Sequence, residues 1–295
     1  MEQAKVYYSD LRCRPGKNLL NKLEKLIRTA GIGEIDFDHK LVAIKMHFGE
    51  PGNLAFLRPN YAKVVADVVK SLGGVPFLTD CNTLYPGRRK NALEHLDAAF
   101  ENGFSPLSTG CQIIIGDGLR GNDDVEVPVA GAEHITTAKI GKAIMEADVV
   151  ISLSHFKGHE QTGFGGAIKN LGMGCGSRRG KMEQHAQGKP VVSQKRCVGC
   201  GKCFTQCAHD AISYGDDRKA SIDLDKCVGC GRCIAVCNAD AIHAGYDAAM
   251  EELGCRMAEY AKAVVDGRPQ FHISLVIDVS PYCDCHGEND LPILP

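Results

Sequence analysis

The chain has 295 residues, enough for one large or two ordinary domains with a buried core. Its 34 basic and 36 acidic residues nearly cancel to a formal charge of −2, without a long run of either sign. This balance argues against nucleic acid or an anionic membrane surface as a partner. No apolar stretch is long enough to span a membrane, and the N-terminus lacks the apolar region of a signal peptide.

Strand and helix patterns alternate along the first 153 residues. We expect strands at 5–8, 41–46, 75–80, 111–115 and 148–153, and helices at 16–30, 61–72, 91–102 and 137–146. The nearly continuous apolar run at 41–46 is typical of a strand buried on both faces of a parallel sheet. The sequence therefore predicts an α/β domain with a parallel or mixed sheet, whose polar, glycine-rich loops meet beyond the carboxyl ends of the strands.

Two cysteine blocks follow, each with the spacing C-x2-C-x2-C-x3-C. This is the spacing of bacterial ferredoxins with two [4Fe-4S] clusters, in which the fourth cysteine of each block binds the other cluster. We therefore predict two [4Fe-4S] clusters. One would be bound by Cys197, Cys200, Cys203 and Cys237, and the other by Cys227, Cys230, Cys233 and Cys207.

The alternatives for these cysteines are a pair of zinc knuckles or a disulfide framework. Zinc sites usually use C-x2-C pairs separated by longer loops, so the spacing favours clusters. Fifteen cysteines without a signal peptide, eight of them assigned to clusters, favour a reducing compartment. We expect a cytoplasmic protein from an organism with a largely anaerobic metabolism.

The chain after the cysteine blocks returns to the α/β pattern. We expect a helix at 246–265 and a buried strand at 273–279 that rejoins the first sheet. The predicted domains are an α/β domain over 1–190, an inserted ferredoxin (α+β) domain over 191–244, and a return to the α/β domain over 245–295. The chain stops soon after a strand and a polar loop, so we expect it to be truncated.

The loop at 154–175 is the richest in chemistry outside the cysteine blocks. Glycine-rich turns at helix starts bind anions, lysines add positive charge, and histidines can bind metals or transfer protons. We therefore predict a site with four candidate catalytic residues, His155, Lys157, His159 and Lys169. The alternative is that the glycines serve tight packing and the histidines have no chemical role.

Further candidates lie at the ends of other predicted strands. They are His47, Glu50, Asp80, Asn82, Thr83, Arg88 and Asp117, each of which could equally be an ordinary turn or capping residue. A third group, Cys283, Cys285 and His286, could bind a soft metal or present a reactive thiol. Free cysteines in a loop at a strand end are the alternative.

Several of these segments occur together in one known family. The segments 47–50, 78–85, 155–159 and 169–174, with the inserted cysteine blocks, resemble the iron–sulfur proteins of domain-of-unknown-function family 362. The resemblance covers essentially the whole chain and implies an α/β domain interrupted by a two-cluster ferredoxin, without an established reaction. Ferredoxins commonly have proline after the fourth cysteine, where this chain has Ala208 and Asn238.

A shorter segment is similar to the nickel-pincer lactate racemases. Their His-x3-Gly-Phe-x-Gly-x2-Lys pattern is matched by His159, Gly163, Phe164, Gly166 and Lys169. The resemblance implies that His159 and Lys169 contact a cofactor or substrate.

Three functions fit these patterns. The first is an iron–sulfur oxidoreductase, or its electron-transfer subunit, which passes electrons to a redox partner protein or to a small-molecule acceptor held over the sheet. The second is an electron carrier or assembly partner whose α/β domain is a docking surface. In the third, the clusters are structural and the α/β site performs metal- or nucleotide-linked chemistry. The first is favoured because a docking surface would not need His155, His159 and Lys169 together.

Overall fold

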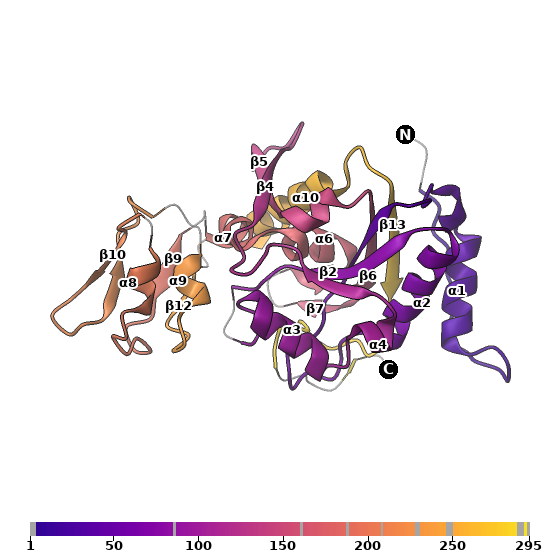
Figure 1. The fold of residues 1–295 in the computed structure, drawn as a ribbon, viewed down its shortest axis with the longest axis horizontal. Helices are drawn as coiled ribbons and strands as arrows, with labels where there is room; N and C mark the ends of the chain where they lie inside the picture. Colours follow the sequence, from indigo (N-terminus) through magenta and orange to yellow (C-terminus); the bar gives the residue numbers. More distant parts are fainter. Residues whose placement is uncertain are drawn as a thin grey trace.

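The computed structural model describes residues 4–84, 87–159, 162–186, 189–207, 209–227, 231–245, 250–287 and 292–293. A larger lobe contains the main sheet and its covering helices, and a smaller lobe formed by the cysteine blocks lies at one end (Figure 1). None of the helices in these residues is both long and apolar enough to cross a membrane.

The centre of the larger lobe is a five-stranded sheet in which every neighbouring pair is parallel. Its order is β13 (Gln270–Leu275), β6 (Val149–His155), β1 (Leu41–Lys45), β2 (Val75–Asp80) and β3 (Gln112–Ile115). Ile44 of β1 pairs with Leu78 on one side and Ile151 on the other. The predicted α/β domain with a parallel sheet is confirmed.

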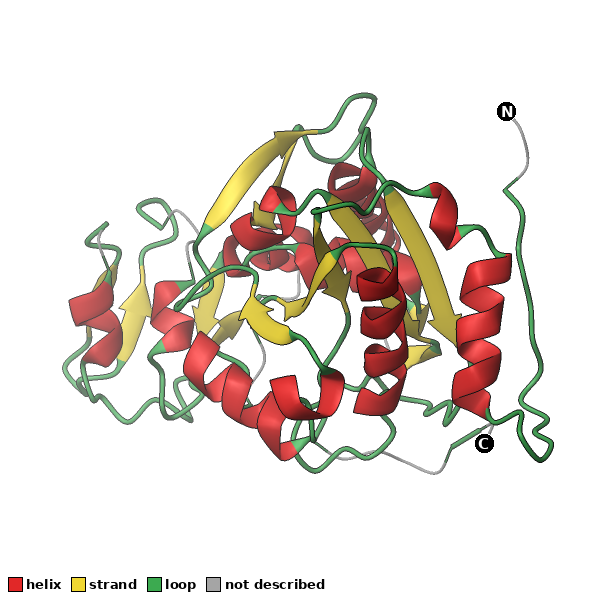
Figure 2. Ribbon diagram, turned by 45° about the vertical axis from the view of Figure 1, so that its right-hand side comes forward, coloured by secondary structure: helices red, strands yellow, loops and turns green. Residues whose placement is uncertain are grey.

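Helices cover both faces of this sheet (Figure 2). Val42 and Ile44 pack on one side against α1 (Leu19–Thr29), α2 (Pro59–Ser71) and α3 (Ala92–Glu101). Ala43 packs on the other side against α6 (Ala167–Cys175) and α10 (Met250–Val265). Because successive strand residues point to opposite faces, a continuous apolar run serves both cores.

Helix starts follow the local sequence. Asn18 accepts a hydrogen bond from the N–H of Asn21 at the start of α1, and Asn91 accepts from the N–H groups of Leu93 and Glu94 at the start of α3. Pro59 begins α2, where its missing N–H costs nothing.

Two predicted elements are wrong. Residues 5–8 form no strand and are largely exposed, because no neighbouring strand pairs with them. The predicted helix at 137–146 begins as β5 (Thr137–Gly141), pairs antiparallel with β4 (Asp124–Pro128), and becomes helical only in α5 (Lys142–Glu146). Ala138 and Ile140 are both buried, so the apolar period here is two, which is the strand period.

The segment after β6 leads towards the smaller lobe. It forms the hairpin of β7 (Lys157–His159) and β8 (Gly163–Gly165), then α6 and α7 (Arg178–Ala186). Two shorter helical turns complete the larger lobe, a 3-10 helix (Ile32–Glu34) and α4 (Pro106–Thr109).

The smaller lobe contains two copies of one arrangement. The first copy is β9 (Pro190–Val192), α8 (Lys202–Gln206) and β10 (Ile212–Tyr214); the second is β11 (Ala220–Ile222), α9 (Arg232–Ala235) and β12 (Ile242–Ala244). The first strand of each copy pairs antiparallel with the last strand of the other. Asp210 and Asp240 occupy equivalent places and share a positive φ, 48° and 47°.

The chain leaves the main sheet after β6 and rejoins it at β13, the strand beside β6. The cysteine blocks therefore lie between two neighbouring strands of one sheet. This confirms that the last predicted strand belongs to the first sheet, although it begins at Gln270 and ends at Leu275 rather than covering 273–279.

Candidate functional site

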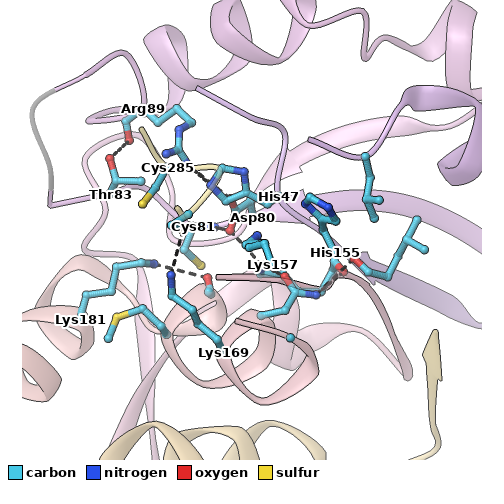
Figure 3. Close-up of a pocket in the computed structure, with 18 residues that line it drawn as sticks. His47, Asp80, Cys81, Thr83, Arg89, His155, Lys157, Lys169, Lys181 and Cys285 are labelled. Carbon is cyan, nitrogen blue, oxygen red and sulfur yellow. Dashed lines mark hydrogen bonds and ion pairs between the residues drawn. The ribbon is translucent and has the colours of Figure 1, made fainter. Parts of the chain in front are cut away.

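A pocket lies beyond the carboxyl ends of the parallel strands (Figure 3). Lys45 and Asp80 reach it from the ends of β1 and β2, and His155 from the end of β6. The loop after β13 adds Cys283 and Cys285. About 70 Å³ of the pocket is open to the centres of water-sized molecules.

Three of the four candidate catalytic residues line the pocket. His155, Lys157 and Lys169 line the pocket, whereas His159 is not among the described residues that line it. His159 lies buried at the end of β7, and its Nδ1 accepts a hydrogen bond from the N–H of Thr162, 3.2 Å away.

The pocket wall is rich in positive charge. Five cationic side chains line it, which are Lys45, Arg89, Lys157, Lys169 and Lys181. Three of them form ion pairs with buried carboxylates: Lys45 with Asp80 at 3.0 Å, Arg89 with Glu50 at 2.7 Å, and Lys157 with Asp284 at 2.7 Å.

Lys169 and Lys181 have no carboxylate within ion-pair distance among the described residues. Lys181 donates to the carbonyl oxygens of Gly176 and Gly174, and Lys169 contacts the sulfur of Cys283 at 2.9 Å. Gly166, at the N-terminal end of α6, also lines the pocket, and the helix dipole adds positive potential there. The pocket therefore favours an anionic ligand.

His155 is tied to the chain around it. Its Nδ1 lies 2.9 Å from a carboxylate oxygen of Asp284, and its Nε2 lies 2.7 Å from the carbonyl oxygen of Ile277. Both ring nitrogens face oxygen atoms that can accept hydrogen bonds, so both sides of the ring have partners within the chain. This arrangement suits a positioning role.

Asp284 is the anchor of the loop after β13. Burial alone would raise its pKa, but the Lys157 ammonium and the His155 ring outweigh burial and lower the pKa of this carboxyl. The charged carboxylate fixes the loop against β6 and β7, so the cysteines on either side of it both line the pocket.

Cys283 is the most acidic thiol of the site. A hydrogen bond from the Cys285 thiol and the nearby ammonium groups of Lys169 and Lys157 lower its pKa, although burial opposes them. The pKa of Cys285 is raised, first by this hydrogen bond and then by burial. The two shifts act in opposite directions, so the Cys283 thiol loses its proton before the Cys285 thiol.

Some of the remaining candidates at strand ends line the pocket and others do not. His47, Asp80 and Thr83 line the pocket, and burial with nearby cations lowers the pKa of His47. Glu50 forms an ion pair with Arg89, which lines the pocket. The other three do not line the pocket: Asn82 donates to Asp117 at 2.8 Å, and Arg88 pairs with Glu101 near the surface. His286, from the third group of candidates, is exposed.

Three cations that line the pocket were not predicted from the sequence. They are Lys45, Arg89 and Lys181. Lys45 ends a buried apolar run, where a charged residue indicates a partner or a site. The position of Lys181 depends on how α7 returns to the sheet, and no local pattern predicts that return.

The smaller lobe contains a second cavity, lined by cysteines. Cys197, Cys200, Cys203 and Cys237 all contribute to it, and about 20 Å³ is open to the centres of water-sized molecules. The N–H of Ala220 lies 3.4 Å from the sulfur of Cys197, and the N–H of Ala241 lies 3.2 Å from that of Cys237. Thiols from both blocks thus surround one space.

The other predicted set is described in part. Cys207 and Cys233 belong to the apolar core of the lobe, and Cys207 accepts a hydrogen bond from the N–H of Ala211 at 3.4 Å. Cys227 is partly buried, and Cys230 lies outside the described residues. Across the residues that are described, no three histidine, cysteine or acidic side chains are close enough to bind a single metal ion.

Two segments connect this lobe to the pocket. Arg89 lines the pocket, while its neighbour Lys90 donates to the carbonyl oxygen of Cys237 at 3.3 Å. On α7, Lys181 lines the pocket, while Met182 packs into the apolar core around Cys203.

Known proteins show several similarities to this chain. It is 30% identical over 125 residues to the thylakoid-associated protein sll1697 of Synechocystis sp., an alignment that covers 42% of this chain and 35% of that protein. The chain thus spans about a third of that relative's length in the alignment.

Two solved structures also match. The lactate racemase apoprotein of Thermoanaerobacterium thermosaccharolyticum matches 88% of this chain and 45% of its own length, with 14% identity and a TM-score of 0.44. A protein from Thermotoga maritima matches 87% and 50%, with 12% identity and a TM-score of 0.42.

The family assignment comes from the sequence profile. The family described as "Domain of unknown function (DUF362)" matches residues 42–295, which include the main sheet, the pocket loops and both cysteine blocks. The chain belongs to this family.

Proposed function

We propose that this protein is an iron–sulfur oxidoreductase, or the electron-transfer subunit of one, that passes electrons through two [4Fe-4S] clusters to an anionic ligand in the α/β pocket. One observation carries the proposal: Cys197, Cys200 and Cys203 share a cavity with Cys237, a residue of the other block. The ferredoxin spacing rule assigns these four thiols to one cluster.

The residues around this cavity fit a cluster of this type. Four thiolates bind four different iron atoms, so they lie further apart than the ligands of a single ion. The N–H groups of Ala220 and Ala241 point at two of the sulfurs, and such hydrogen bonds tune the reduction potential. The clusters would supply one-electron transfer. Cys207, Cys227, Cys230 and Cys233 would hold the second.

The pocket in the larger lobe supports the second half of the proposal. Lys169 and Lys181 are two cations without a carboxylate partner among the described residues. They would bind a ligand with two negative charges, such as a phosphate or a dicarboxylate. Because most of the charged side chains that line the pocket are buried, each charge interaction is stronger there than in open water.

The two lobes are close enough for a short path between clusters and pocket. Arg178 on α7 packs so closely on Gly231 of the second cysteine block that its Cδ lies 2.4 Å from where a β-carbon of Gly231 would be. The next turn of the same helix carries Lys181 into the pocket. An electron acceptor held by Lys181 would therefore lie one helix away from the second block.

A second candidate function is that of an electron carrier for another protein. Val198 is 72% exposed beside the exposed Cys200, and Phe204 is 50% exposed on α8. This apolar surface would suit docking of a redox partner protein. A location in the cytoplasm remains part of the proposal, because free thiols and clusters favour a reducing compartment.

Iron and sulfide analysis of anaerobically purified protein tests the proposal. We expect about eight iron atoms per chain, and about four in Cys237→Ser. Cys255→Ser, which changes a cysteine on α10 outside the cavity, should keep about eight. Eight iron atoms in Cys237→Ser would overturn the assignment.

The pocket is tested separately with inorganic phosphate as the probe. Lys181→Gln should leave the iron content unchanged and weaken phosphate binding, measured as the phosphate-dependent rise in thermal midpoint. A phosphate response equal to that of the unaltered protein would support the carrier function instead.

A further inference from the structure

We infer that Cys283 and Cys285 form a reversible dithiol–disulfide couple that takes two electrons from the clusters and delivers them to an anionic organic disulfide. This inference rests on the proposed function and names the substrate class of its pocket. Two observations carry it: the turn that holds the two cysteines and the lysines beside them.

Cys283 and Cys285 lie in one tight turn. The N–H of His286 donates to the carbonyl oxygen of Cys283 at 3.1 Å, closing a tight turn, and Asp284 points away into its ion pairs. In an extended chain, residues two apart are separated by roughly 6.6–7.2 Å. A disulfide needs Cα atoms about 4.4–6.8 Å apart, so a turn favours its formation. Both cysteines also line the same pocket.

The lysines stabilise the reactive thiolate of Cys283 and attract an anionic substrate. Lys169 lies 2.9 Å from the Cys283 sulfur and stabilises it as the thiolate, the form that attacks disulfides. Cys285 is less buried than Cys283, and both line the pocket. Figure 3 shows Cys285 and Lys181 on the same pocket as Lys169. A substrate disulfide that carries carboxylates would be drawn to this positive wall.

The reaction balances with an external one-electron donor as the reductant. The Cys283 thiolate attacks a substrate disulfide RSSR, forms a mixed disulfide and releases RS⁻. The Cys285 sulfur then displaces the second RS group, which leaves as RSH with the proton of Cys285, and a Cys283–Cys285 disulfide forms. Two electrons and one proton break this disulfide and restore the thiolate and the thiol. Two one-electron clusters can supply those two electrons, which come from an external one-electron donor.

The test uses the anionic disulfide 5,5′-dithiobis(2-nitrobenzoate) on the anaerobic holoprotein. After treatment and removal of the reagent, peptide mass spectrometry should find Cys283 linked to Cys285. Exposed thiols such as Cys13 can keep a thionitrobenzoate group as a mixed disulfide, so the readout is the link at Cys283 and not the total number of electrons consumed. In Cys285→Ser, with about eight irons retained, Cys283 should instead carry the thionitrobenzoate group, because no second thiol displaces it.

Cys13→Ser is the matched control, because Cys13 is an exposed cysteine outside the pocket, and it should behave like the unaltered protein. Absence of the Cys283–Cys285 link from an unaltered protein with about eight irons would overturn the dithiol couple and leave the proposed function standing. Absence of iron would overturn both.

Discussion

At the scale of single residues, the contact between Lys169 and Cys283 joins a cation of the pocket to one of its thiols. The ammonium lies 2.9 Å from the sulfur and helps to lower the thiol pKa, together with the hydrogen bond from Cys285. Lys169→Gln should therefore raise the pH midpoint at which Cys283 reacts with iodoacetate, followed by peptide mass spectrometry. Lys181→Gln also removes one pocket cation but not this contact, and should shift the midpoint less. Equal shifts would mean that only the overall charge matters.

His95 on α3 controls stability in acid. Its ring is fully buried against Phe48, and neither ring nitrogen has a hydrogen-bond partner in the described part of the chain. Burial lowers its pKa from 6.5 to about 3, with Asp80 acting in the opposite direction. Below about pH 6.5 the His95 ring is therefore protonated in the unfolded chain, whereas in the folded chain it is protonated only near pH 3.

This histidine should cost the protein about 1.4 kcal/mol of stability per pH unit as the pH falls through that range. His95→Leu should flatten the decline of the thermal midpoint between about pH 6 and pH 4. His39→Gln, a change at an exposed histidine, should keep the original decline. Parallel curves for His95→Leu and the unaltered protein would show that this ring does not contribute.

At the scale of elements, the close packing of α6 on α10 depends on Gly172. A β-carbon there would lie 2.0 Å from the backbone oxygen of Met257. Gly172→Ala should therefore separate the two helices and lower the thermal midpoint, with a cost of roughly 1–3 kcal/mol. Gly254→Ala on α10 has no neighbour within 4 Å of the added carbon and should be neutral or stabilise by about 0.5–1 kcal/mol. Similar midpoints for the two variants would refute this account of the packing.

The sequence predicts best those helices and strands whose hydrophobic residues follow one clear pattern. The apolar runs of β1 and β2 identify strands buried on both faces, and glycines end the helices between them. The β4–β5 hairpin was missed because its alternation is short and charged, as in Asp124 and Glu126. Its strands are stabilised by pairing with each other and by packing of Ala138 and Ile140. This is a tertiary effect that the strand propensities of single residues do not predict.

At the scale of the whole molecule, the pocket depends on sheet order. Loops after strands were expected to converge, and His47, Asp80, Lys157 and Lys169 do line one pocket. The ion pair between Lys157 and Asp284 joins residues far apart in sequence, and it follows only from the position of β13 beside β6. Sequence alone cannot supply that neighbour relation.

The repeat in the cysteine blocks was the most predictable feature of the site. Its spacing predicted which four thiols belong together, and those of the first set line one cavity. The clusters stay a prediction, as do the roles of His155 and His159. The ion pairs of His155 and the hairpin position of His159 suggest that these rings position the loops around the pocket.

Electron paramagnetic resonance of the dithionite-reduced holoprotein tests the central claim most directly. Two clusters within one small lobe lie close enough to interact magnetically, so we predict a complex spectrum from two coupled clusters. Adding inorganic phosphate should perturb this spectrum or its potential only slightly, because the pocket lies in the other lobe. A silent spectrum with zinc in place of iron, or the simple spectrum of one isolated cluster, would contradict the two-cluster account.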